Sequence, residues 1–323
     1  MKEGHIPELD GIRAMSILLV LATHLLPVGP ARFHLNSMTG LMGMSLFFCL
    51  SGFLITRFLF ERPDVRTFLT RRIARIYPLL AVYAILVPGL ALSRWDASVG
   101  IVFGYINYDD PLLFKGTSHF WSICVELHFY LGIGLAVLLM GRRGFWLVPL
   151  CALLVLLLRI DDGAYQSIRT HLRIDEILSG SLLALIWLHR QHPLAEAFRR
   201  ILATGFLPLL LLWLLSCHEI GGPVQYARPY LAMGVVGSII FMPEGFIRQI
   251  CRNGVLKYLA GISYALYVWH PMTAMGWLGT GGGWERYLIK RPISFALTFL
   301  LAHISTNTLE TYFIRLARRG KPA

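Results

Sequence analysis

Apolar runs of helical length, separated by short polar segments, make up most of the chain. Ten runs lie near residues 12–30, 39–57, 76–93, 119–140, 145–159, 174–189, 201–217, 229–242, 256–276 and 292–314. A helix of about 20 apolar residues crosses the hydrocarbon core of a bilayer, although several of these runs are shorter. The pattern predicts an all-α fold, a polytopic integral membrane bundle of about ten transmembrane helices.

One more apolar run, from Val99 to Tyr108, is shorter still. Counting it as a span would reverse the side of every later loop and place the arginine-rich loops outside the cell. We therefore interpret it as a re-entrant or interfacial segment.

The composition agrees with a membrane class. Of 323 residues, 56% are hydrophobic and 15% charged, which is too apolar for a soluble protein. The length suits one domain, so we expect a single transmembrane domain over residues 1–323. The first apolar run lacks a basic n-region and a small-residue cleavage site, so we expect it to be retained as a helix.

The cysteines and the net charge each argue against a class of function. The five cysteines lie in or beside apolar runs without CxxC spacing, which indicates neither a disulfide framework nor a metal site. A net charge of +12 in a soluble protein would suggest a nucleic-acid partner. Here the basic residues separate apolar runs, which is typical of membrane topology signals, so we expect a lipid bilayer and no nucleic acid.

Lysine and arginine are distributed unequally between alternate loops. With the N-terminus in the cytoplasm, 19 of the 30 lie in cytoplasmic segments and ten in the opposite loops, while Arg13 lies within the first helix. The positive-inside rule then predicts that both termini are cytoplasmic. We expect a multi-pass protein of the cell inner (plasma) membrane.

The first apolar run carries two ionisable residues, Arg13 and His24. Eleven residues correspond to three helical turns plus about 20°, so the two side chains share one face, about 16 Å apart along the axis. Ionisable residues inside membrane helices usually face the bundle interior, which makes both of them functional candidates. Alternatively, Arg13 reaches the interface and His24 is a hydrogen-bonded packing residue.

A basic cluster, Arg71, Arg72 and Arg75, precedes the third run on the predicted cytoplasmic side. Such a cluster can anchor anionic lipid head groups. Arginine also suits bidentate contacts to phosphate, so together with Arg13 the cluster could instead hold a phosphorylated cofactor.

Polar residues also enter three later runs. His119, Ser122 and Glu126 share one face of the fourth helix, toward the outer half of the membrane, and a glutamate inside an apolar span is hard to explain as packing. Arg173 and Asp175 stand at the outer start of the sixth helix, where they bind a ligand or simply form a solvated helix start. His270 shares a face of the ninth helix with Ser263 and Tyr267 and is followed by Pro271.

Several motifs in order give the chain a family resemblance. They are LDGIRAMSILLVLATH, SLFFCLSGFLI, RRIARIYP, HFWSICVELHFYL, RIDEILSGSLLA and SYALYVWHP, between about residues 7 and 314. In this set the chain resembles the acyltransferase 3 family of integral membrane acyltransferases, whose pattern of Arg, ten residues and His matches Arg13 and His24. It departs from the family at Leu127 and His128, and in a C-terminal helix that matches only loosely.

The resemblance implies an enzyme that transfers an acyl group, usually acetyl, from acyl-coenzyme A to a hydroxyl of a carbohydrate or glycosylated acceptor. Acyl-coenzyme A would be a donor substrate, with no permanently bound cofactor and no metal. His24 would be the general base, because imidazole titrates near neutral pH, and Glu126 or His119 would orient it or the acceptor. Arg13, Arg71, Arg72 and Arg75 would hold the donor's phosphates. Trp121, Ser122, Arg173, Asp175 and His270 would contact the acceptor.

Two alternatives stay open. A covalent route through Ser122 or Cys124 is chemically available, although neither lies in a recognisable nucleophile elbow. A transporter or lipid flippase would use the intramembrane histidines and glutamate as a proton relay. The two halves of the chain show no pair of Gly/Pro-interrupted repeats, which argues against transport.

Overall fold

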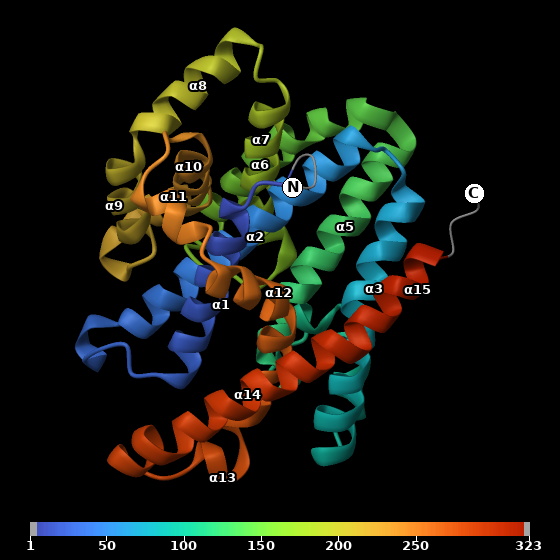
Figure 1. Cartoon of the computed structure of the whole chain (residues 1–323), viewed down its shortest axis with the longest axis vertical. Helices are drawn as coiled ribbons and strands as arrows, with labels where there is room; N and C mark the ends of the chain where they lie inside the picture. The colour runs from blue at the N-terminus through green and yellow to red at the C-terminus, as the bar shows by residue number, and fades with distance from the viewer. Residues whose placement is uncertain (1–4, 320–323) are drawn as a thin grey trace. The chain divides into compact units, whose positions relative to one another are not determined.

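The computed structural model describes residues 5–319, which form helices and turns without a β-strand (Figure 1). The predicted all-α class is confirmed. Within this part of the chain, four helical segments are long and apolar enough to cross a membrane, or five if one bent pair forms a single span. They are Leu35–Glu61, Val65–Ala91, Ser118–Asp161 and Glu285–Arg318. The number of ten spans stays a prediction.

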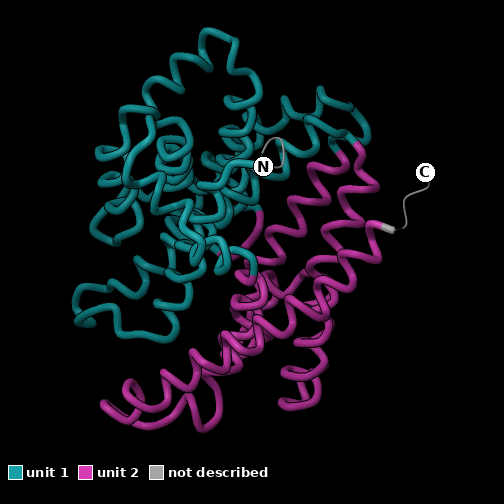
Figure 2. Tube along the Cα trace, in the orientation of Figure 1, with its two compact units in different colours: residues 1–63, 136–167, 171–261 teal, residues 64–135, 168–170, 262–323 magenta. Residues whose placement is uncertain are grey.

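The chain divides into two compact units, each assembled from segments that are distant in the sequence (Figure 2). Unit 1 comprises residues 1–63, 136–167 and 171–261, and unit 2 comprises residues 64–135, 168–170 and 262–323. The predicted site residues are therefore divided between two bodies.

Unit 1 is built around the long helix α2, which packs against α1, α7 and α10. Its core contains Phe53 of α2, Leu183 of α7 and Val236 of α10, all fully buried. The helices of unit 1 are α1 (Glu8–Leu25), α2 (Leu35–Glu61), α6 (Leu147–Asp161), α7 (Asp175–Leu188), α8 (Pro193–Thr204), α9 (Phe206–Ser216), α10 (Arg228–Phe241) and α11 (Phe246–Cys251).

Two glycines allow α2 and α7 to approach at the backbone. A Cβ atom on Gly52 would lie 1.8 Å from the carbonyl oxygen of Ile177, and one on Gly180 would lie 1.8 Å from that of Cys49. No side chain fits at either position, and close approach through small residues is a common way for membrane helices to associate. Gly52 and Gly180 therefore serve the packing of α2 against α7.

The start of α1 is tied to α11 by a buried carboxylate. Glu8 is 1% exposed, and its Oε1 atom accepts hydrogen bonds from Nε of Arg248 and Nε of Arg252, each at 2.8 Å. A Cβ atom on Gly11 would lie 2.3 Å from the carbonyl oxygen of Cys251. These contacts fix the helix that carries Arg13 and His24 within unit 1.

Helices α8 and α9 meet at Gly205 with a bend of 82°. Leu194, Phe198 and Ile201 form an exposed apolar stripe along α8, whereas Ala195 and Leu202 are buried beneath it. Helix α9 is almost wholly apolar. The pair thus combines an amphipathic helix with a membrane-type helix.

Unit 2 contains α3 (Val65–Ala84), α4 (Trp95–Val102), most of α5 (Trp121–Met140), the end of α12 (Gly254–Trp269), α13 (Gly276–Gly279), α14 (Arg291–Ser305) and α15 (Thr311–Arg319). A side-chain cap starts α3, since Oδ1 of Asp64 accepts a hydrogen bond from the backbone N–H of Thr67 at 2.9 Å. Helices α14 and α15 continue into one another through a π-helical turn, Thr306–Glu310, and α15 lies against α3 (Figure 1). The basic cluster is therefore part of α3 itself.

The run from Val99 to Tyr108 does not form a spanning helix. Its first residues complete α4, which has eight residues and a length of about 12 Å. Two short 3-10 turns follow, Ile106–Tyr108 and Asp110–Leu112. A segment of this length cannot cross a bilayer core as a single helix.

Candidate active site

The predicted site residues fall into two groups. Unit 1 contains Arg13, His24, Arg173 and Asp175. Unit 2 contains the basic cluster and the residues of α5 and α12, namely Arg71, Arg72, Arg75, His119, Trp121, Ser122, Glu126 and His270.

His24 lies in the last turn of α1, where a backbone contact selects its tautomer. Its Nδ1 atom lies 2.8 Å from the carbonyl oxygen of Val20. A carbonyl only accepts, so the neutral imidazole carries its proton on Nδ1 and the lone pair on Nε2. An imidazole in this state can accept a proton from a hydroxyl at Nε2, as a general base must. Ile17 and Val20, between Arg13 and His24 on the same helix face, are buried.

Hydrogen bonds connect the start of α5 to the end of α12 in unit 2. The Tyr267 hydroxyl lies 2.6 Å from Oγ of Ser122 and donates to the carbonyl oxygen of His119 at 2.5 Å. Nδ1 of His270 lies 2.7 Å from the carbonyl oxygen of Tyr267. The ring centroids of His119 and His270 are 5.4 Å apart, and all four side chains are buried. The structure thus brings together three of the predicted residues.

Tyr267 is the member of this group that the sequence did not assign to the site. The signal was present, because Tyr267 shares a face of α12 with His270. His119 lies in a 3-10 turn, Ser118–Phe120, rather than within α5. Trp121, the first residue of α5, is partly exposed beside Ser122.

Glu126 is buried one turn after Ser122, at 6% exposure. It interacts with Tyr130, the residue one turn further along α5. The Arg72 guanidinium lies 5.5 Å from the centroid of the Tyr130 ring and 5.8 Å from that of Phe68. Glu126 is therefore connected through Tyr130 to the basic cluster of α3.

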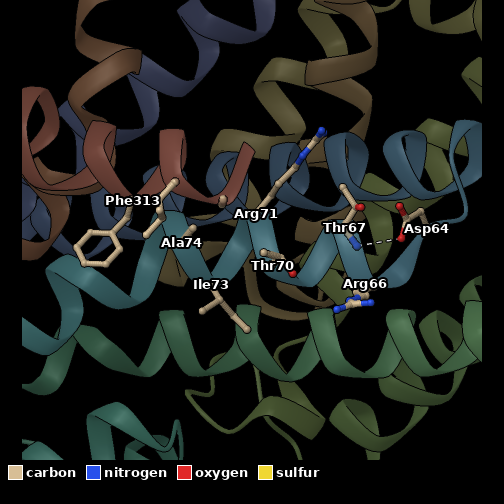
Figure 3. A pocket seen from close by; sticks show the side chains of 10 residues that line it. Asp64, Arg66, Thr67, Thr70, Arg71, Ile73, Ala74 and Phe313 are labelled. Atoms are coloured by element: carbon tan, nitrogen blue, oxygen red, sulfur yellow. Dashed lines mark hydrogen bonds between the residues drawn. The ribbon is translucent and has the colours of Figure 1, made fainter. Parts of the chain in front are cut away.

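The three arginines of the basic cluster have different surroundings. Arg71 lines a cavity between α3 and α15, together with Arg66 (Figure 3). Arg72 lies over aromatic rings, as described above. Arg75 is half-buried and interacts electrostatically with the buried carboxyl of Glu310. The cluster is therefore not a uniform basic surface.

Arg173 and Asp175 belong to a buried ion network in unit 1. Nη1 of Arg159 lies 2.5 Å from Oδ2 of Asp175. Glu176 pairs with Nε of Arg228 at 3.0 Å and with Nη2 of Arg173 at 3.2 Å. All five residues are at most 3% exposed. The alternative of a solvated helix start is therefore wrong.

Arg159 and Arg228 complete this network and were not identified from the sequence. The signal was their position, since Arg159 ends one apolar run and Arg228 precedes another. Their partners lie at other places in the chain, on α7, and periodicity along a single helix carries no information about such pairing.

The comparisons with known proteins agree with the sequence motifs. Residues 6–306 match the model of the family described as "Acyltransferase domain". The chain is 26% identical over 97% of its length to "Putative O-acetyltransferase SACOL0978" of Staphylococcus aureus (strain COL), of which it covers 58%. It is 25% identical over 95% of its length to "Peptidoglycan O-acetyltransferase OatA" of Listeria monocytogenes, of which it covers 55%.

The chain thus spans little more than half the length of these two relatives. No solved structure matches it. The family match nevertheless covers most of both units, including α1 and the start of α3. The protein belongs to the acyltransferase 3 family, as the motifs of its sequence predict.

Proposed function

We propose that this protein is a membrane-embedded O-acyltransferase that moves an acyl group, acetyl in the simplest case, from acyl-coenzyme A to a hydroxyl of a carbohydrate acceptor. The observation that carries the proposal is the family match over residues 6–306. The names of the relatives support O-acetylation of a carbohydrate, and that of the Listeria protein makes peptidoglycan the first acceptor to test.

In the proposed reaction His24 is the general base. Nε2 of His24 takes the proton of the acceptor hydroxyl while its oxygen attacks the thioester carbonyl. An ester bond forms, the carbon–sulfur bond breaks, and the coenzyme A thiolate leaves and takes the proton. Arg13, Arg71, Arg72 and Arg75 hold the donor's phosphates at the cytoplasmic face.

The length of acyl-coenzyme A agrees with the roles proposed for Arg13 at its phosphates and for His24 at its thioester. Along α1, Arg13 and His24 are separated by about 16 Å, which is comparable to an extended pantetheine arm. A donor held by its phosphates on the Arg13 side would therefore present its thioester on the His24 side. Glu126 and His119 orient the acceptor or the base, and His270, Trp121 and Ser122 contact the acceptor.

The hydrogen bonds of Ser122 favour direct transfer over an acyl-enzyme. Its Oγ atom pairs with the Tyr267 hydroxyl, whereas an activated serine pairs with a base such as imidazole. The other candidate nucleophile, Cys124, is 1% exposed. Neither group is arranged as an activated nucleophile in this structure.

Deletion of the gene is expected to remove O-acetyl groups from an envelope polysaccharide, with peptidoglycan examined first. Mass spectrometry of enzymatically released fragments would show a loss of about 42 Da per acetyl group, which is the mass of the acetyl group less the hydrogen it replaces. The wild-type gene, supplied in trans, should restore them. An unchanged acetylation pattern across all envelope polysaccharides would contradict the proposed function.

The proposed orientation predicts that both termini and the segment from Arg57 to Arg75 are cytoplasmic. In a variant without native cysteines, Arg66→Cys should react with a membrane-impermeant maleimide only after the cells are permeabilised. Asp110→Cys, at an exposed position in the predicted outer loop, is the matched control and should react in intact cells. Labelling of position 66 in intact cells would reverse the topology.

A further inference from the structure

The cavity between α3 and α15 has a volume of about 750 Å³. A cavity of this size can hold a drug-sized ligand. It lies within unit 2 and extends along the first ten residues or so of α3, which rise about 15 Å. Its lining has a polar part and an apolar part.

The polar part comes from α3. Thr70 and Arg71 follow Thr67 by three and four residues, whereas the Arg66 side chain extends from the opposite side of α3 to that of Arg71 (Figure 3). The Arg71 guanidinium and the two hydroxyls suit an anion with several oxygens, such as a phosphate. The Asp64 carboxylate, also in the lining, accepts the capping hydrogen bond from the Thr67 N–H (Figure 3).

The apolar part joins the two helices. Phe313, Leu316 and Ala317 lie at i, i+3 and i+4, so they share one face of α15. Ala74 of α3 also lines this wall, whereas Ile73 points away from α15, and Figure 3 shows the Phe313 ring reaching toward α3. A flat aromatic ligand could lie against such a wall, next to the cationic part.

We propose that this cavity, called the α3–α15 groove below, binds the phosphorylated adenosine end of acyl-coenzyme A, with Phe313 of α15 against the adenine and Arg71 on a phosphate. The inference rests on the proposed donor. A lipid head group offers phosphate but no flat ring for Phe313, so the combined lining favours the nucleotide. Helix α15 lies beyond residue 306, where the family match ends, so the match does not assign this role to it.

The test is a binding titration of the purified full chain with two probes, coenzyme A and adenosine 3′,5′-bisphosphate. Phe313→Ala and Arg71→Ala should each raise the Kd of both probes roughly tenfold, since one stacked base or one charge-assisted hydrogen bond contributes about that much. Phe313→Leu should show most of the Phe313→Ala effect, because it removes the ring and keeps the apolar bulk. Phe103→Ala, at an exposed residue of unit 2 outside the cavity, should bind like wild type.

The outcomes separate this inference from the proposed function. If wild-type protein binds coenzyme A and the monodisperse groove variants have Kd values within twofold of the wild-type value, the groove is not the nucleotide site. Coenzyme A then remains the proposed donor. If wild-type protein binds neither probe, the donor assignment itself is wrong, and this inference with it.

A second experiment tests whether the phosphate that binds in the groove belongs to a lipid head group. Native mass spectrometry of protein taken from nanodiscs containing phosphatidylglycerol counts the bound lipid. Variants that lose this lipid and keep their affinity for adenosine 3′,5′-bisphosphate would identify a lipid head-group site and overturn the proposal. The proposal is supported if the variants retain as much lipid as wild type and bind adenosine 3′,5′-bisphosphate more weakly.

Discussion

His24→Asn is expected to abolish acyl transfer by the purified protein and to leave its fold intact. Loss of a general base typically lowers the rate by about 10² to 10⁴. Asparagine keeps a hydrogen-bonding side chain, so it can replace the contact with the Val20 carbonyl but cannot take up a proton at neutral pH. A histidine that only packs would tolerate this change.

The measurement is acetyl transfer to an oligosaccharide by monodisperse His24→Asn protein whose coenzyme A affinity equals that of wild type. Equal donor affinity separates a lost base from a lost donor site. Substantial transfer would remove His24 from the mechanism. The buried pair His119 and His270 would then become the candidates for the base.

Asp175→Ala is expected to destabilise the protein by about 3–5 kcal/mol, because it leaves the buried charge of Arg159 without its carboxylate. Unfolding in detergent, followed by circular dichroism, measures the change. Asp96→Ala is the matched control, since Asp96 is exposed and pairs with Arg94 in solvent, and its unfolding midpoint should barely move.

A double variant of Asp175 and its partner Arg159 distinguishes a role of Asp175 in stability from a role in acceptor binding. Arg159→Met combined with Asp175→Leu removes both charges at similar side-chain volume, so no unpaired charge is left, although the carbonyl oxygens of Gln225 and Tyr226 lose their donor. If this folded double variant transfers at the wild-type rate, Asp175 is structural and is not an acceptor contact. A folded variant with normal donor affinity and a raised KM for the acceptor would support the predicted contact.

Hydrophobic patterning predicted the class and most helices of this fold, and its errors have identifiable causes. The third helix was expected from residue 76 but begins at Val65. Its first turns read RTFLTRRIAR, which is too basic for an apolar window, although the Asp64 cap marks the start. The basic cluster consequently lies on a helix, where neighbouring arginines point in different directions.

Some of the site residues were identified from the sequence and others were not. The pair Arg13 and His24 could be found from its spacing on one helix, and Ser122 from its place in a motif. Tyr267, Arg159 and Arg228 were not assigned, because spacing along one helix does not show the partners on other helices through which each acts. Their roles depend on long-range packing, which a single sequence without an alignment does not reveal.

The bend at Gly205 affects how the irregular backbone after α9 is solvated. Helix α9 has 11 residues and a length of about 16 Å, roughly half of a 30 Å hydrocarbon core. If α8 lies along the cytoplasmic interface, as the predicted topology implies, the 3-10 segment Glu219–Ala227 begins at membrane depth, where lipid offers its carbonyls no donors.

The buried arginines of unit 1 provide such donors. Nη1 and Nη2 of Arg159 lie 3.5 Å and 3.4 Å from the carbonyl oxygens of Tyr226 and Gln225, at the end of this segment. Nη2 of Arg228 donates to the carbonyl oxygen of Tyr165, in the loop before α7, at 3.0 Å. The ion network therefore takes the place of water at the end of this segment and at Tyr165. An apolar replacement of the whole network would leave these carbonyls unsolvated, even where it removed every unpaired charge.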